Sequence, residues 1–276
     1  MQKQKRKLNL FKDSRGGIEI IILLIIFVAS IFIVGGIFPK LSKTDPNAEK
    51  FTAITGIPLD SHNSLQLKTI KFKKCLGQTN VDLLLDRTGS MGERTPTGQT
   101  KIARLKEAVL VLTGQLSDQS VVGIQSFSSE SITDDVPISY YKDVKGIISS
   151  KVNALNAGGQ TPTHDALAFS LDRLKEAIPK FPGRQFNFIL ISDGQPVPPS
   201  QDPRLFNPNP ADEIKNLRVN VYTLGIFTSG EASEPKLAEL LKSIASRPEN
   251  YYEAQTGDQA TKLLEAILTK ICEQTN

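Results

Sequence analysis

The sequence has few histidines and cysteines, two residue types that many enzymes use as base or nucleophile. Its 276 residues include two histidines, two cysteines and no tryptophan. A hydrolase built on a Ser-His-Asp triad would need His62 or His164 as its base. His62 falls in a segment that we interpret as a stalk, and His164 is expected in the solvated first turn of a helix. We therefore predict that the protein is not an enzyme.

The charge pattern gives no sign of a nucleic-acid or nucleotide partner. The net charge is only +4, and the first fifteen residues alone hold six basic residues against one acidic residue. The sequence has no basic stripe interleaved with aromatic residues and no G-x-x-x-x-G-K-[ST] run. An aspartyl phosphatase would need a second acid two residues after Asp86, where this chain has Thr88. Nucleic-acid binding and both kinds of phosphate chemistry are thus disfavoured.

One hydrophobic run is long enough to cross a membrane. Ile20 to Phe38 spans nineteen residues without a charge, about 28 Å as a helix against a bilayer core of roughly 30 Å. A buried soluble helix and a cleaved signal peptide are the alternatives, although no cleavage site of small residues follows the run. Basic residues are denser before it than after it. The positive-inside rule then predicts a cytoplasmic N-terminus (residues 1–17), a transmembrane anchor (residues 18–38) and an extracytoplasmic C-terminal part in the cell membrane.

The rest of the chain divides into a stalk and one domain. Residues 39–74 are interrupted by several prolines, and the alternation within Ser64–Lys74 fits an edge strand or an extended lead-in. Residues 75–276 form the domain, with Cys75 before its first predicted strand and Cys272 in its last predicted helix. In an oxidising compartment such a pair predicts a disulfide, and two buried free thiols are the alternative.

Strand-like and helix-like segments alternate through this domain. The predicted strands are Val81–Leu85, Val121–Phe127, Val136–Tyr141, Phe186–Ile191, Val219–Phe227 and Tyr251–Ala254. The predicted helices are Lys101–Leu116, Val144–Leu155, His164–Ile178, Ala211–Leu217, Glu234–Ala245 and Asp258–Glu273. This alternation predicts an α/β fold with a doubly wound, mostly parallel sheet and helices on both faces. Too few residues separate the second and third strands for a crossover helix, so one antiparallel edge strand is expected.

Oxygen-bearing side chains follow these strands at points where a parallel sheet collects its ligands. Asp86, Thr88 and Ser90 follow the first strand, Thr161 precedes a helix, and Asp193 follows the Phe186–Ile191 strand. Two carboxylates and three hydroxyls form a hard oxygen shell that suits Mg²⁺, Mn²⁺ or Ca²⁺. The sequence therefore predicts a divalent-cation site at one edge of the sheet.

Three signatures in this region resemble those of the von Willebrand factor type A domain family. They are Asp86-Arg87-Thr88-Gly89-Ser90-Met91, Gly158-Gly159-Gln160-Thr161-Pro162-Thr163 and Ile191-Ser192-Asp193-Gly194. They occur in order within a stretch from about Val81 to Ile271. The first is similar to the family's D-x-S-x-S motif, with Thr88 where serine is more usual; threonine keeps the hydroxyl.

The resemblance implies a metal-ion-dependent adhesion site formed by Asp86, Thr88, Ser90, Thr161 and Asp193. It implies a cation, most simply Mg²⁺, with a coordination position left for the carboxylate of another protein. We therefore predict a membrane-anchored, metal-dependent protein-binding module on the cell surface. The alternative is a structural component of pilus or envelope assembly, in which the metal only stabilises the fold. The proline-rich segment Gln195–Pro210 is either a stiff connector or a rim that selects the partner.

Overall fold

The computed structural model describes residues 52–57, 66–71, 79–95, 98–227, 235–254 and 257–274. The predicted cytoplasmic N-terminus and transmembrane anchor lie outside these residues. In the part of the chain that is described, no helix combines the length and the apolar character that crossing a bilayer requires. Within the predicted stalk, β1 (Thr52–Ile57) and β2 (Gln66–Lys71) pair with each other as a two-stranded antiparallel sheet. The alternating segment thus contains a strand, but its partner is β1 and not the main sheet.

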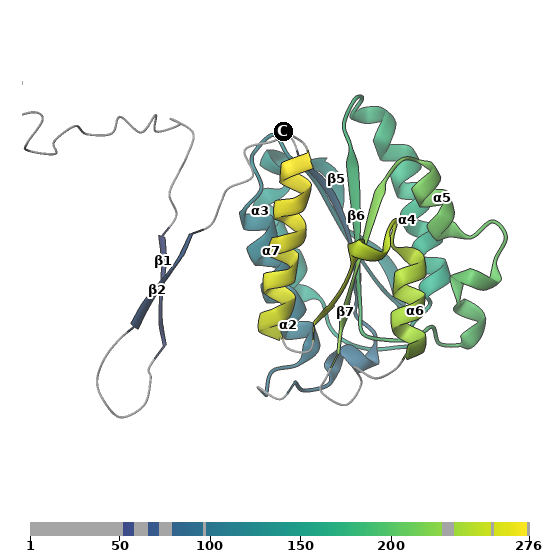
Figure 1. The fold of residues 1–276 in the computed structure, drawn as a ribbon, viewed down its shortest axis with the longest axis horizontal. Coiled ribbons are helices and arrows are strands. Elements are labelled where there is room, and N and C mark those ends of the chain that lie inside the picture. Colours follow the sequence, from purple (N-terminus) through teal and green to yellow (C-terminus); the bar gives the residue numbers. More distant parts are fainter. Residues whose placement is uncertain are drawn as a thin grey trace, which may run out of the picture. The chain divides into compact units, whose positions relative to one another are not determined.

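The domain is built on a six-stranded sheet with the order β5-β4-β3-β6-β7-β8 (Figure 1). Its strands are β3 (Asn80–Asp86), β4 (Val121–Ser128), β5 (Ser131–Tyr140), β6 (Phe186–Ser192), β7 (Asn220–Ile226) and β8 (Tyr251–Ala254). All neighbouring pairs are parallel except β4 and β5, so the antiparallel strand lies at one edge. The predicted fold class of the domain is confirmed.

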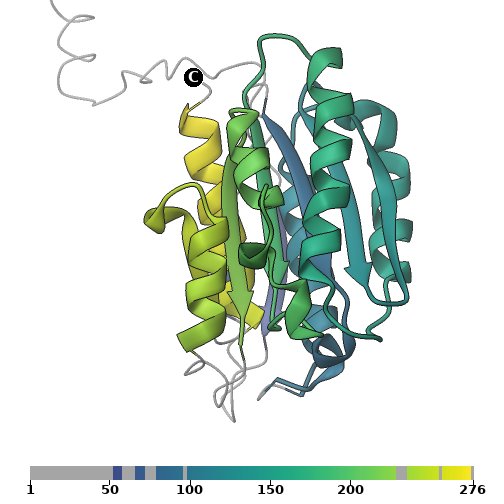
Figure 2. The same cartoon turned by 90° about the vertical axis from the view of Figure 1, so that its right-hand side faces the viewer.

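Helices cover both faces of this sheet, as Figures 1 and 2 show. One face carries α2 (Lys101–Gly114), α3 (Tyr141–Ala154) and α7 (Gly257–Gln274). The other carries α4 (Thr163–Ala177), α5 (Pro210–Asn216) and α6 (Pro235–Ile244). The domain therefore has two apolar cores, one on each side of the sheet.

The apolar pattern of the sequence explains the central strands. All seven residues of β3 and all seven of β6 are buried, as expected for strands covered on both faces. Leu83 and Leu85 pack into one core and Leu84 into the other, because successive side chains of a strand point to opposite faces. Burial of each leucine side chain contributes about 1.5–3 kcal/mol. The polar ends of β3 and β6 are thereby fixed next to each other.

Two element boundaries differ from the sequence prediction by more than two residues. Strand β5 begins at Ser131, five residues before the predicted start at Val136, and α3 begins at Tyr141 instead of Val144. Only Val136 is buried in β5, because this strand lies at the edge of the sheet. The first half of β5 therefore carries no apolar alternation by which it can be predicted.

Cys272 lies near the end of α7, where its sulfur is 3.8 Å from Oγ1 of Thr79. Thr79 immediately precedes β3 and follows Cys75 by four residues. Cys75 itself lies outside the described residues, so the disulfide between the two cysteines stays a prediction. The position of Cys272 beside the start of the first core strand favours it.

Candidate metal centre

The five predicted ligands lie on three loops at the carboxyl edge of the sheet. Leu85 of β3 is paired with Ile191 of β6, so Asp86 and Ser192 end neighbouring parallel strands. The first loop follows β3 and carries Thr88 and Ser90, the second follows β6 and carries Asp193, and the third precedes α4 and carries Thr161. Two backbone hydrogen bonds join the third loop to the first, from Gly89 N to Gly159 O (2.9 Å) and from Gly158 N to Arg87 O (2.9 Å). Gly159 has a φ of +76°, and a Cβ there would lie 2.8 Å from Oγ of Ser129. Glycine at this position lets the loop lie close to Ser129, the residue that follows β4.

Asp86 is fully buried and is held by two hydrogen bonds. The backbone N–H of Thr88 donates to its Oδ1 at 2.8 Å, and the hydroxyl of Ser192 donates to its Oδ2 at 2.5 Å. Burial, and then the negative charge of nearby Asp193, raise the pKa of the Asp86 carboxyl to about 7. Two carboxylates held together in a dry site need positive charge for both to stay ionised.

Hydroxyl groups connect the first loop to Asp193. Ser90 donates to Oδ1 of Asp193 at 2.8 Å, and its Oγ lies 3.2 Å from Oγ1 of Thr88. Ser90 sits in a single turn of 3₁₀ helix, Gly89–Gly92, whose Met91 is fully buried and packs in the core beneath the loop. The buried methionine thus anchors the loop that presents the hydroxyls.

Thr161 completes the group from the third loop. A Cβ on Gly194 would lie 3.3 Å from Oγ1 of Thr161 and 3.5 Å from Oγ of Ser90. Both hydroxyls therefore lie next to Gly194, the residue that follows Asp193. Because Gly194 has no side chain, no Cβ crowds the Thr161 and Ser90 hydroxyls. The structure brings all five predicted side chains together; their coordination of a metal stays a prediction.

Sequence reasoning missed one member of the cluster, Lys101. Its side chain is fully buried, and its Nζ lies 2.7 Å from Oδ2 of Asp193 and 2.9 Å from Oε2 of Glu93. Lys101 is the first residue of α2, where the helix dipole disfavours a positive charge. A lysine at the start of a predicted helix, ten residues after the first signature, is unfavourable by itself. This is the signal in the sequence that indicates a negatively charged partner.

The donor set fits a hard divalent cation. The described residues contain no group of three or more His, Cys, Asp or Glu side chains that could hold a metal ion. They contain instead two buried carboxylates with three hydroxyls, which suits oxygen-binding cations. The ammonium of Lys101 against Asp193 shows that this site accepts positive charge.

The sequence model described as "von Willebrand factor type A domain" matches residues 80–266. The chain belongs to the von Willebrand factor type A domain family. The matched range includes every residue of the candidate metal centre, and the family assignment confirms the predicted resemblance. No curated protein matches the sequence at a significant level.

Solved structures share the fold of this type A domain at low identity. Proximal thread matrix protein 1 from the mussel byssus is 18% identical with a TM-score of 0.55, over 72% of this chain and 47% of that one. Another structure of that protein has a zinc-occupied MIDAS motif, the metal-ion-dependent adhesion site. The pilus adhesin SpaC from Lactobacillus rhamnosus GG is 16% identical with a TM-score of 0.57, over 72% and 31%.

The von Willebrand factor domain of the type V pili tip protein Mfa5 from Porphyromonas gingivalis is 12% identical with a TM-score of 0.56, over 72% of this chain and 97% of that one. The chain spans less than half the length of the mussel protein and of SpaC. At these identities the likeness establishes the shared fold.

The proline-rich segment Gln195–Pro210 begins directly beside the metal centre. The N–H of Val197 donates to the carbonyl of Thr161 at 3.0 Å. The segment exposes Val197, Leu205 and Phe206, and the Phe206 ring stacks on His164 with centroids 3.4 Å apart. His164 is thus partly covered and not the solvated residue that the sequence suggested. These contacts place the segment at the border of the metal centre. Whether it is a stiff connector or a rim that selects the partner stays a prediction.

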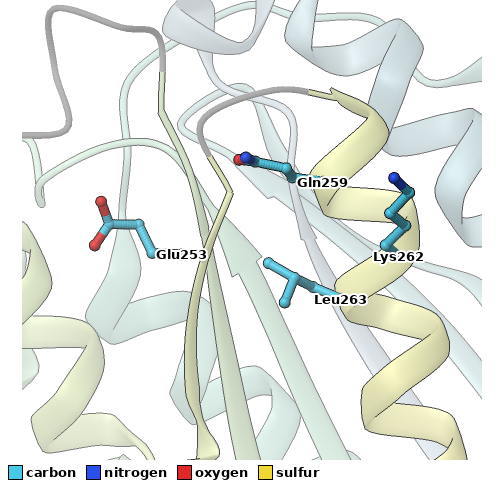
Figure 3. Close-up of a pocket in the computed structure, with 4 residues that line it drawn as sticks. All are labelled: Glu253, Gln259, Lys262 and Leu263. Carbon is cyan, nitrogen blue, oxygen red and sulfur yellow. The ribbon is translucent and has the colours of Figure 1, made fainter.

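A hollow lies between β8 and the first turns of α7 (Figure 3). It has a volume of about 590 Å³ and is lined by Glu253, Gln259, Lys262 and Leu263. None of the five predicted ligands is among these residues. The lining combines one acid, one base, one amide and one apolar side chain, and it assigns no chemistry by itself.

Proposed function

We propose that this type A domain binds another protein through a divalent cation held by Asp86, Thr88, Ser90, Thr161 and Asp193. The observation that carries the proposal is the convergence of five oxygen side chains from three loops on one edge of the sheet, against a buried ammonium. When bound, the cation supplies a coordination position for a carboxylate oxygen of the partner. Mg²⁺ is the proposed ion, and Mn²⁺ or Ca²⁺ would suit the same oxygens.

Some of these side chains would supply negative charge to the cation, and others would supply only oxygen dipoles. Asp86 and Asp193 provide the negative charge that attracts the cation. Thr88, Ser90 and Thr161 contribute oxygen dipoles without further charge, so the site does not repel an incoming carboxylate. The exposed Val197, Leu205 and Phe206 provide apolar contacts for the same partner on the adjoining rim. We assign the site to binding and not to catalysis.

Calorimetric titration of the full-length chain with Mg²⁺ and Mn²⁺ tests the site. Wild-type protein should bind, and the Asp86→Ala variant should lose most of the heat. Asp118→Ala is the matched control, because Asp118 is exposed in the turn before β4, at the opposite end of the sheet. Equal heats for wild type and Asp86→Ala would refute the assignment.

A structural role in pilus or envelope assembly is the second candidate. Two of the similar structures are described as a pilus adhesin and a pili tip protein, which agrees with adhesion as well as with pilus assembly. The two candidates differ in what a chelator does. If EDTA abolishes capture of the partner, the cation bridges the two proteins. If EDTA lowers the melting temperature but leaves capture unchanged, the cation only stabilises the fold.

We further propose that the Ile20–Phe38 run anchors the chain in the cell membrane with the type A domain outside. The proposal rests on the length and charge flanks of that run. Protease added to intact cells should then digest the domain and leave a short membrane-bound fragment. Protection of the domain in intact cells, with digestion after lysis, would place it inside.

A further inference from the structure

Lys101 occupies an unusual position for a lysine. Its side chain has no exposed surface, and a fully buried ammonium is stable only when it is paired. It is paired with Asp193, one of the two carboxylates of the candidate metal centre, through a contact of 2.7 Å. The same Nζ contacts Glu93, whose side chain is 54% exposed.

This contact changes the charge of the site. Asp86 and Asp193 alone carry two negative charges, which a divalent ion would neutralise. Together with the Lys101 ammonium, the two carboxylates carry a net charge of −1. A divalent ion must therefore share Asp193 with an ammonium that is already in place. Like charges within a few ångströms in a partly buried site repel strongly. Lys101 therefore opposes the ion and, in its absence, offsets the repulsion between the two carboxylates.

Glu93 gives the ammonium a second counter-ion. It follows the Ser90 turn, and its Oε2 accepts a hydrogen bond from Nζ of Lys101 at 2.9 Å. Lys101 can therefore keep one ion pair when Asp193 turns its charge toward a metal. Removal of the Glu93 charge would strengthen the attraction between the ammonium and Asp193, and removal of the Lys101 charge would end the competition between that ammonium and a metal for Asp193. The two substitutions should act on metal affinity in opposite directions.

We propose that Lys101 is a tethered cation that holds the metal centre assembled without metal and keeps its affinity for divalent ions low. The inference rests on the proposed function, because it concerns the same five oxygen ligands. It adds a regulatory residue outside the three signatures. Lys101 acts through Asp193 and is a positioning residue, not a ligand.

The test uses two measurements on the full-length chain, titration with Mg²⁺ alone and thermal unfolding in EDTA or excess Mg²⁺. Lys101→Met should raise the affinity for Mg²⁺ about tenfold or more, since it removes a unit positive charge next to Asp193. It should also lower the melting temperature in EDTA, and Mg²⁺ should restore much of that loss. Glu93→Gln should weaken Mg²⁺ binding.

Lys145→Met is the matched control, because it removes the same charge from an exposed pair with Asp118 at the opposite end of the sheet. It should leave the Mg²⁺ affinity within about twofold. If Lys101→Met fails to fold in EDTA, Lys101→Gln keeps a hydrogen-bond donor without the charge and takes its place.

The outcomes separate this inference from the proposed function. Unchanged Mg²⁺ affinity in Lys101→Met, with an equal loss of stability in EDTA and in Mg²⁺, would overturn the inference while leaving the metal site intact. If neither wild type nor Lys101→Met binds Mg²⁺, the proposed function and the inference both fail. Tighter binding by Lys101→Met together with weaker binding by Glu93→Gln supports the tethered cation.

Discussion

Asp82 of β3 and Arg173 of α4 form an ion pair in the interior of the domain, with Nη1 of Arg173 2.7 Å from Oδ1 of Asp82. The carboxylate is fully buried, and its other oxygen accepts a hydrogen bond from Gln125 at 2.9 Å. Arg173 also reaches Asp134 and the carbonyl of Val136 on β5. The guanidinium thereby ties α4 to two strands, β5 and the β3 strand that presents Asp86.

Gly123 on β4 leaves the space through which this ion pair forms. A Cβ there would lie 2.5 Å from Oδ1 of Asp82 and 2.9 Å from Nη2 of Arg173. Gly123→Ala should therefore lower the free energy of unfolding by about 1–3 kcal/mol, the usual cost of overpacking a core. Denaturant unfolding measures the change.

Gly146→Ala is the control for Gly123→Ala. Gly146 lies inside α3 with nothing within 4 Å of an added Cβ. Alanine there should raise the free energy of unfolding by about 0.5–1 kcal/mol, because glycine is the poorer helix former. Equal effects of the two substitutions would contradict the crowding argument.

The buried carboxyl of Asp82 should also make stability depend on pH. Desolvation outweighs the attraction of Arg173 and raises the pKa of Asp82 from 3.8 to about 6. The folded state therefore binds this proton more tightly than the unfolded state, so stability falls as pH rises from about 4 to 6. The shift corresponds to roughly 3 kcal/mol between pH 3.5 and pH 7.

Asp82→Asn isolates this contribution from those of other groups. The free energy of unfolding of wild type, measured in EDTA by denaturant at several pH values, should decline through this window more steeply than that of the variant. The difference between the two curves should level off above about pH 7, where Asp82 is ionised in both states. Parallel curves would show that Asp82 keeps an ordinary pKa in the folded protein.

A bridge between Cys75 and Cys272 should stabilise the domain considerably. It would close a loop of nearly two hundred residues, and chain entropy then gives on the order of 4–5 kcal/mol, less any strain. Reduction, or the Cys272→Ser substitution, should lower the melting temperature. Intact-mass measurement with and without reductant checks the bridge directly, and two thiols that react freely in the unreduced protein would exclude it.

The sequence predicted those parts of the molecule that depend on local pattern. Buried parallel strands such as β3 are nearly continuous apolar runs, which can be recognised in the sequence. Two of the three signatures come at the ends of such strands, and the other comes directly before a helix. The missing parts depend on contacts across the fold. Lys101 reaches Asp193 from ninety-two residues away, and Arg173 reaches Asp82 from ninety-one. No periodicity in the chain indicates which buried charge meets which.

Thr88 offers the sharpest test of the hydroxyl ligands. Its side chain is almost fully buried, with Oγ1 3.2 Å from Oγ of Ser90. Thr88→Val keeps the shape and removes the hydroxyl, so Mg²⁺ affinity should fall about tenfold or more while the metal-free melting temperature changes little. Thr88→Ser restores the oxygen and should bind Mg²⁺ as wild type does. Calorimetry on the three proteins decides the question: if valine and serine behave alike, the Thr88 hydroxyl does not contribute to the metal shell.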